Sequence, residues 1–200
     1  MVSLKIQPIK YIVLHHTATG LDTSVDSIKK GSMHWLSQNE RLSYFGNGYV
    51  CDYHWLVDQD GKVYKGQDEK MVSFHSGINE INDQSIAICA IGNFQEYGMN
   101  VKQFTGLLQT IMIVKKRYPK AIIVRHRDIV STDCPGSFYP IEKITKFVNI
   151  QDLNPASWDF KYVVPMLFYG HYSVSEKIYP DKPLTRAEYA VLKCKENRWV

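Results

Sequence analysis

The sequence predicts an α/β fold in which helices flank a central mixed β-sheet of about five or six strands. Short β-branched, apolar runs alternate along the chain with segments of helical periodicity. Residues Ser85 to Ile91 form a continuous run of small and apolar residues, which is typical of a central strand. An Asp-Gly pair at 60–61 separates two further apolar runs, which indicates a hairpin. We expect a small helical appendage after the sheet.

Length and composition fit one globular domain with such an appendage. The chain has 200 residues, of which 44% are apolar and 22% are charged, so it can bury a substantial core without crosslinks. The four cysteines are widely spaced and include no Cys-X-X-Cys pair, so we expect reduced thiols rather than a disulfide framework. They are Cys51, Cys89, Cys134 and Cys194.

Charge and hydropathy argue against several classes of partner. The net charge is +4, but no arginine-rich block accompanies it, so we expect no nucleic-acid partner. No run reaches the roughly 18 apolar residues of a membrane span, and the first residues lack the apolar core of a signal peptide. We therefore expect a soluble monomer that is made in the cytosol, has no membrane partner and needs another factor to leave the cell.

The first predicted strand, Tyr11 to Leu14, is apolar and β-branched, and two histidines follow it. Side chains alternate between the faces of a strand, so His15 and His16 point in opposite directions and at most one of them can join a given site. A helix is expected over Ser24 to Gln38, and a loop over 39–50.

The hairpin is expected to pair Tyr53 to Val57 with Lys62 to Tyr64. By alternation, Tyr53 and His54 lie on opposite faces of their strand. The polar residues 68–84 that follow are expected to form a loop.

The second half of the sheet domain contains the clearest helix and one more strand. Val101 to Tyr118 has apolar residues at helical spacing, and Pro119 ends the pattern because proline cannot continue a helix. The short strand Ala121 to Val124 then places His126 just past its C-terminal end.

A change of composition near Asn154 and Pro155 predicts the domain boundary. Residues 1–153 form the sheet domain, and residues 154–200 form a small helical tail. Within that tail, Thr185 and Glu188 have the spacing of a helix capping box.

The chemistry of the sequence centres on the segment RHRDIVSTDCPGSF, in which His126 and Cys134 are two good zinc ligands. One histidine of the pair after the first strand would complete a set of two histidines and one cysteine. Three protein ligands leave a fourth position open for water, which is the mark of a catalytic zinc. Taken singly, each residue has a plainer interpretation, since a histidine between arginines is often on the surface and a lone cysteine is often a small core residue.

Four segments resemble a known family. In order, YIVLHHTAT, DYHWLVDQDGKVYKG, HSGINEINDQSIAICAIGNF and RHRDIVSTDCPG are similar to zinc-dependent N-acetylmuramoyl-L-alanine amidases, which include amidase-type phage lysozymes and peptidoglycan recognition proteins. The resemblance implies Zn²⁺ bound by His15, His126 and Cys134, with Tyr53 as the catalytic tyrosine. Thr132 stands where some phage members have a lysine and where amidase-active recognition proteins have a threonine, and we expect it to donate to the tetrahedral oxygen.

The resemblance also bears on three other residues. Recycling amidases of the family place a carboxylate about where this chain has Cys89, so we interpret Cys89 as a core residue. His75 and Trp35 are candidates to line the substrate cleft. The alternatives are a solvated loop histidine for His75 and core packing for Trp35.

The tail resembles a single S-layer homology repeat, chiefly through PDKPLTRAEYA. Such repeats bind wall polysaccharide, usually as three copies. The other interpretation is a helical extension that packs on the catalytic domain.

The resemblance implies a peptidoglycan hydrolase that cleaves the amide between N-acetylmuramic acid and L-alanine. The simplest form is a phage endolysin that is stored in the cytosol and released through a holin. Two alternatives remain, namely a non-catalytic peptidoglycan-binding module and a cytosolic amidase that recycles muropeptides. Binding-only members of the family commonly lack the cysteine ligand, whereas this chain has Cys134.

Overall fold

The computed structural model describes residues 4–5, 7–38 and 50–171, with only the backbone described at 35–38. The chain separates into two compact units, Met1–Pro140 and Ile141–Val200. The first unit therefore ends earlier in the chain than the sequence-based boundary at residue 153, and that boundary stays a prediction. Each unit is described by itself.

The first unit is built on a five-stranded mixed sheet with the order β3-β2-β4-β1-β5. The central strand β4 pairs in parallel with β1 and β2, β1 pairs in parallel with β5, and only β2 and β3 are antiparallel. The predicted α/β class, the mixed sheet and the hairpin are thus confirmed. The strands are β1 (Tyr11–His16), β2 (Trp55–Val57), β3 (Val63–Lys65), β4 (Ser85–Ala90) and β5 (Ile122–Arg125).

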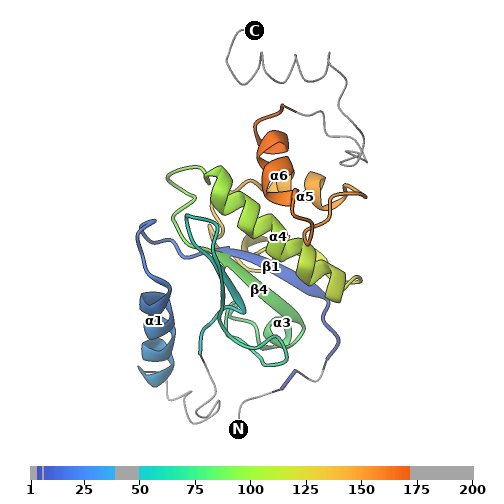
Figure 1. The fold of residues 1–200 in the computed structure, drawn as a ribbon. Helices are drawn as coiled ribbons and strands as arrows, with labels where there is room; N and C mark the ends of the chain where they lie inside the picture. The colour runs from blue at the N-terminus through green and yellow to red at the C-terminus, as the bar shows by residue number, and fades with distance from the viewer. Residues whose placement is uncertain (1–3, 6, 39–49, 172–200) are drawn as a thin grey trace, which may run out of the picture. The chain divides into compact units, whose positions relative to one another are not determined.

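Helices flank this sheet, as Figure 1 shows for α1 (Val25–Gln38), α3 (Asn79–Asp83) and α4 (Val101–Arg117). At the start of α4, the Asn100 side chain accepts a hydrogen bond from the N–H of Gln103 and so satisfies a donor that the helix itself leaves open. The prediction that all of residues 68–84 form a loop is wrong, because α3 occupies its last part. A short 3₁₀ turn, η2 (His126–Asp128), follows β5 directly.

The two faces of the sheet differ in character. On one face, His15 of β1, Cys89 of β4 and Leu56 of β2 lie in register. Val25 and Ile28 of α1 pack against a buried cluster on this face that includes Leu56 and Cys89. Cys89 is fully buried there, as expected for a core residue.

The opposite face is largely apolar. By alternation it carries Leu14 of β1 and Ile88 of β4, both fully buried. Helix α4 contacts four of the strands, and its buried residues follow helical spacing. Each fully buried aliphatic side chain of this kind contributes about 1.5–3 kcal/mol. The face that carries His15 can therefore hold polar groups because the other face supplies much of the apolar core.

The described part of the second unit contains α5 (Ile141–Val148) and α6 (Phe160–Phe168). Ile144 and Phe147 of α5 are buried, as are Val164 and Leu167 of α6. The segments that resemble an S-layer homology repeat, including Thr185 and Glu188, lie outside the described residues.

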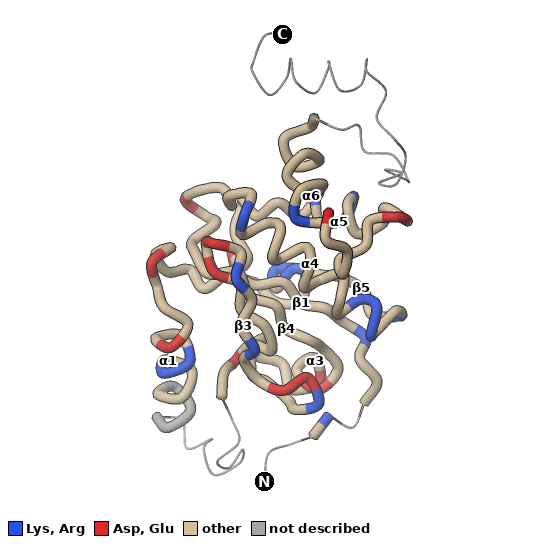
Figure 2. The backbone as a smooth tube through the Cα atoms, in the orientation of Figure 1, with Lys and Arg blue, Asp and Glu red and all other residues tan. Residues whose placement is uncertain are grey.

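Charged residues of both signs are spread over the described backbone, and Figure 2 shows basic and acidic positions close together in several places. Lys65 pairs with Asp68, and Arg125 pairs with Asp128. Among the described residues, no helix combines the length and the apolar character that a membrane crossing requires.

Candidate functional site

The site begins at the C-terminal ends of β1 and β5, which are parallel neighbours. Leu14 pairs with Arg125, so the residues that follow, His15 and His126, emerge side by side at the same sheet edge. Their ring centroids are 4.6 Å apart. The parallel pairing of the two strands thus brings together two histidines that are more than a hundred residues apart in the sequence.

Cys134 joins them from the loop after η2. The N–H of Arg127 donates to the carbonyl of Cys134 at 2.9 Å, which folds the loop back onto the turn. Gly136 has a φ of 105° and lies against the backbone of Phe94 so closely that a Cβ there would overlap it. These constraints hold the Cys134 Sγ 3.7 Å from the Nδ1 of His15.

The donor set fits a zinc ion. The ligand atoms of His15, His126 and Cys134 all lie within 4.8 Å of one another. A tetrahedral zinc with bonds of about 2.0–2.3 Å places its ligands about 3.5 Å apart, which is close to the separation of the Cys134 sulfur and the His15 nitrogen. Imidazole and thiolate are also the ligand types that zinc prefers over magnesium or calcium.

His16 takes the opposite face of the strand, as alternation requires. Its Nδ1 accepts a hydrogen bond from the N–H of Phe94 at 3.1 Å, so this side chain serves a structural contact. Its backbone N–H points instead toward the Cys134 Sγ, at 3.4 Å. The two histidines of the pair therefore have separate tasks, and His15 alone belongs to the metal-binding group that the described residues contain.

The protonation states of the three side chains follow from burial. Burial lowers the pKa of His15 well below its usual value, and the neighbouring histidines lower it further. Burial also lowers the pKa of His126, with the Ser76 carbonyl acting in the opposite direction. The same effect raises the pKa of the Cys134 thiol to about 11, against the influence of the His16 N–H and Arg127. At neutral pH the histidines are thus ready to bind a metal, whereas the thiol must lose a proton to do so.

These protonation states predict how zinc affinity depends on pH. Because the thiol pKa of about 11 lies above the working range, zinc binding near neutral pH should release one proton from Cys134. The association constant should then rise about tenfold per pH unit between about pH 7 and 9. Competition with a chelator of known pH dependence measures this slope. A flat profile over that range would contradict a thiol ligand that is protonated in the metal-free protein.

Tyr53 lies at the edge of the cluster, just before β2. Its ring centroid is 5.3 Å from that of His15, and its side chain is half-buried. Its backbone carbonyl accepts from the N–H of Gln67 at 2.8 Å, which fixes the start of the hairpin. Burial raises the pKa of the Tyr53 phenol well above its usual value, and nearby Cys89 and Cys134 act in the same direction. The hydroxyl is therefore a hydrogen-bond donor rather than a base.

Thr132 is on the same loop as Cys134. Its Oγ1 accepts a hydrogen bond from the backbone N–H of Cys134 at 3.3 Å. A hydroxyl that accepts in this way keeps its own proton for donation. Thr132 is thus next to the cluster with a donor available, and its catalytic role stays a prediction.

His75 and Trp35 were proposed from the sequence to line the substrate cleft, and the structure describes the side chain of His75 only. His75 is only 6% exposed, so the interpretation as a solvated loop histidine is wrong. Its Nδ1 lies 3.0 Å from the Nε2 of His15, which places it against a candidate metal ligand. The side chain of Trp35 lies outside the described residues.

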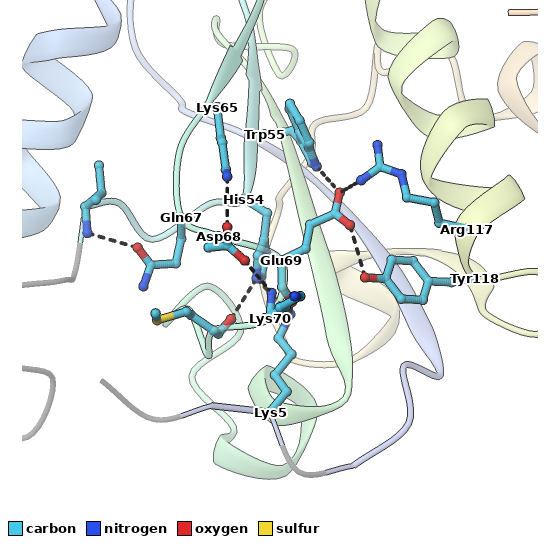
Figure 3. Close-up of polar contacts among 12 residues, drawn as sticks. Lys5, His54, Trp55, Lys65, Gln67, Asp68, Glu69, Lys70, Arg117 and Tyr118 are labelled. Atoms are coloured by element: carbon cyan, nitrogen blue, oxygen red, sulfur yellow. Dashed lines mark hydrogen bonds and ion pairs between the residues drawn. The ribbon is translucent and has the colours of Figure 1, made fainter. Parts of the chain in front are cut away.

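Sequence reasoning missed a polar network on the same side of the sheet, part of which is drawn in Figure 3. His54 is fully buried, and its Nδ1 accepts from the N–H of Ala87 at 2.9 Å. Lys5 Nζ lies 2.8 Å from the Nε2 of His54 and donates to the Ser85 carbonyl at 2.6 Å. Burial lowers the pKa of Lys5 to about 7, although the carboxylate of Glu69 and other acidic groups oppose the shift.

The same figure shows how Glu69 joins distant elements. Its carboxylate accepts from the Trp55 indole at 2.6 Å and from Tyr118 at 3.0 Å, and it forms an ion pair with Arg117. For His54, the sequence did contain a signal of burial, since alternation places it on the same strand face as the apolar residue Leu56.

Comparison with known proteins identifies the family. The family model Amidase_2, described as N-acetylmuramoyl-L-alanine amidase, matches residues 5–137, which include all three cluster residues, Tyr53 and Thr132. The chain belongs to this amidase family. The match covers the five strands and ends just before the second unit.

The chain is similar to phage endolysins and to peptidoglycan-recognition proteins. An endolysin of Enterobacteria phage K11 is 28% identical over 89 residues, which is 42% of this chain and 58% of that protein. Peptidoglycan-recognition protein SC2 of Drosophila simulans is 28% identical over 133 residues, which is 64% of this chain and 69% of that protein. The chain thus spans little more than half the length of the curated phage endolysin.

A solved structure supports the same family assignment. The N-acetylmuramoyl-L-alanine amidase LysC from Clostridium intestinale URNW aligns with a TM-score of 0.61 and 26% identity, covering 76% of this chain and 91% of that one. The amidase fold is therefore present in this chain nearly as completely as in that protein.

Proposed function

We propose that this chain is a zinc-dependent peptidoglycan hydrolase that cleaves the amide between N-acetylmuramic acid and L-alanine. The observation that supports the proposal most is the convergence of His15, His126 and Cys134 in a member of the amidase family. Zinc would be bound by the Nδ1 of His15, by His126 and by the Cys134 sulfur. When bound there, it would supply a Lewis acid that lowers the pKa of water to about 7.

Two side chains would act on the scissile amide directly. Tyr53, as a protonated phenol beside His15, would donate a hydrogen bond to the developing oxyanion or orient the attacking water. Thr132, whose Oγ1 accepts from the N–H of Cys134, would donate a hydrogen bond from its hydroxyl to the tetrahedral oxygen. Both groups are donors, which suits a reaction in which negative charge develops on a carbonyl oxygen.

A phage endolysin is the biological role that we propose. The phage relatives support it, since they carry that name and are 27–28% identical to this chain over 89 residues. We propose that the protein acts on the wall from inside the host cell after release through a holin. A non-catalytic recognition module is the second candidate, because peptidoglycan recognition proteins are also related. The retained cysteine favours hydrolysis over binding alone.

Digestion of purified walls tests the function. Turbidity of a wall suspension should fall with the protein and should stay constant when a zinc chelator is present. Mass spectrometry of the products should show free L-alanine amino termini and muramic acid residues without peptide. Products with new reducing sugar ends and intact muramoyl–alanine bonds would show that the proposed bond is wrong. Activity on soluble muropeptides without activity on intact walls would indicate the recycling amidase.

We also propose that the tail adds affinity for wall polysaccharide. In its described part, Trp158 is 80% exposed and its ring packs edge-on against that of Tyr162, so aromatic faces are available for contact with sugars.

A chain that ends at Leu153 should still cleave walls but should pellet less with them than the full chain does. Binding assays at matched protein concentrations measure the difference. Equal pelleting of the two proteins would argue against wall affinity, and insolubility of the short chain alone would indicate a structural tail.

A further inference from the structure

A continuous chain of hydrogen bonds runs from the candidate metal cluster into the protein interior. The Nε2 of His15 lies 3.0 Å from the Nδ1 of His75. The Nε2 of His75 lies 2.7 Å from the Oγ of Ser85, and that hydroxyl donates to the carbonyl of Ile81 at 2.6 Å. The first three of these residues are almost completely buried.

The direction of each bond in this chain can be deduced from its far end. The carbonyl of Ile81 can only accept, so the Ser85 hydroxyl proton points toward it. Ser85 Oγ must then accept from His75, which places the His75 proton on Nε2. A neutral imidazole has one proton, so the Nδ1 of His75 is an acceptor and His15 must donate to it from its own Nε2.

The His75 ring is almost completely buried between the imidazole of His15 and the hydroxyl of Ser85, and neither partner has a negative charge that would stabilise an imidazolium. Burial lowers the pKa of His75 well below its usual value, and His54, Lys5 and His126 lower it further. With its proton on Nε2, His15 keeps the Nδ1 lone pair free. That atom is the one that faces the Cys134 Sγ.

The next residue, Ser76, supports the second histidine of the cluster. Its carbonyl lies 3.4 Å from the Nε2 of His126. This is a long hydrogen bond, and a carbonyl can only accept, so His126 would also donate from its Nε2. Ser76 is itself held in place, since its N–H and its hydroxyl both donate to the buried Asn82 side chain, at 3.0 and 2.8 Å. The pair His75–Ser76 is thus anchored on α3 and on the start of β4, and it faces both histidine ligands.

We propose that His75 is a positioning residue which, through Ser85, holds His15 in the Nε2–H tautomer that points the Nδ1 lone pair into the metal cluster. The proposal rests on the zinc site put forward above, and it assigns His75 a task other than lining the substrate cleft. A hydrogen-bond partner behind a metal-binding histidine fixes the orientation of the ring and increases its basicity, and its loss typically weakens metal binding 10- to 100-fold.

A matched pair of substitutions at His75 tests this proposal. In His75→Asn the amide oxygen takes roughly the place of the ring Nδ1 and can still accept from His15. In His75→Gln the amide lies nearer the position of the ring Nε2, so the contact with Ser85 is favoured over the one with His15. Zinc dissociation constants are measured on metal-free protein by competition with a chelator, together with the melting temperature of the same metal-free samples.

We expect His75→Gln to weaken zinc binding by about 10- to 100-fold and His75→Asn to remain within about threefold of the parent. The metal-free melting temperatures of the two variants should be similar. Equal zinc affinity in the parent and in both variants would overturn the proposal. So would equal losses in both variants that follow their loss of metal-free stability, because His75 would then have only a structural role.

Two further measurements test the proposal even if the His75 variants do not fold. Long-range ¹H–¹⁵N spectra of the metal-free parent should show the Nε2–H tautomer for both His15 and His75, and a proton on the Nδ1 of His75 would overturn the proposal. Ser85→Ala removes one oxygen atom and should weaken zinc binding several-fold, whereas unchanged zinc affinity would contradict a positioning role of the hydrogen-bond chain. None of these measurements uses cleavage, so they distinguish a failure of this proposal from a failure of the amidase assignment.

Discussion

Replacement of Cys134 by serine should abolish zinc binding and wall cleavage while leaving peptidoglycan binding largely intact. A serine hydroxyl is not ionised at neutral pH and lacks the soft sulfur, so it is a far poorer zinc ligand than a thiolate. Substrate affinity should survive because the sheet edge and its loops are held by backbone contacts, such as the bond from the Arg127 N–H to the Cys134 carbonyl. The measurements are zinc content, pelleting with walls and the release of new amino termini.

Cys51→Ala is the matched control for this experiment. Cys51 is a buried thiol in the apolar cluster beside Leu56 and Cys89, and it is not among the cluster residues that could bind a metal. This variant should keep its zinc and its activity. Wall cleavage by Cys134→Ser at the rate of the parent would refute the zinc-hydrolase mechanism, and failure of that variant to fold would show that the site is structural.

Replacement of Tyr53 by phenylalanine should lower kcat by about 100-fold or more, with zinc content unchanged. The substitution removes only a hydroxyl, and this hydroxyl is a donor because burial keeps the phenol protonated. If the bond forms mainly in the transition state, kcat and kcat/KM should fall together and the affinity for walls should stay the same.

Tyr64→Phe provides the control, since Tyr64 lies in β3 and its hydroxyl donates to Asp58, just after β2, at 2.9 Å. Its kcat should remain close to that of the parent. A Tyr53→Phe variant with nearly parental kcat would remove Tyr53 from the catalytic residues.

Much of the fold could be predicted because its elements have local signatures. The apolar run before His15, the Asp-Gly turn of the hairpin and the helical spacing before Pro119 each depend on neighbouring residues only. The convergence of His15 and His126 was also predictable, because parallel strands bring their C-terminal ends to one edge. Alternation correctly separated His15 from His16, but only the family resemblance selected the first as the ligand.

The remaining features depend on contacts that are distant in the sequence. Helix α3 is too short to show periodicity, so residues 68–84 resembled a plain loop. The burial of His75 results from its contacts with His15 and Ser85, which come from two neighbouring strands. Lys5 and His54 are likewise held by β4, because Lys5 donates to the Ser85 carbonyl and His54 accepts from the Ala87 N–H. No pattern within a short window of sequence could have revealed these partners.

Zinc stoichiometry in the parent and two variants tests the proposed metal site most directly. His126→Ala removes a proposed ligand, whereas His16→Asn changes the other histidine of the pair and keeps an acceptor for the Phe94 N–H. Elemental analysis should find one zinc per chain in the parent and in His16→Asn, and almost none in His126→Ala. Full zinc occupancy in His126→Ala, or loss of zinc in His16→Asn alone, would contradict a site formed by His15, His126 and Cys134.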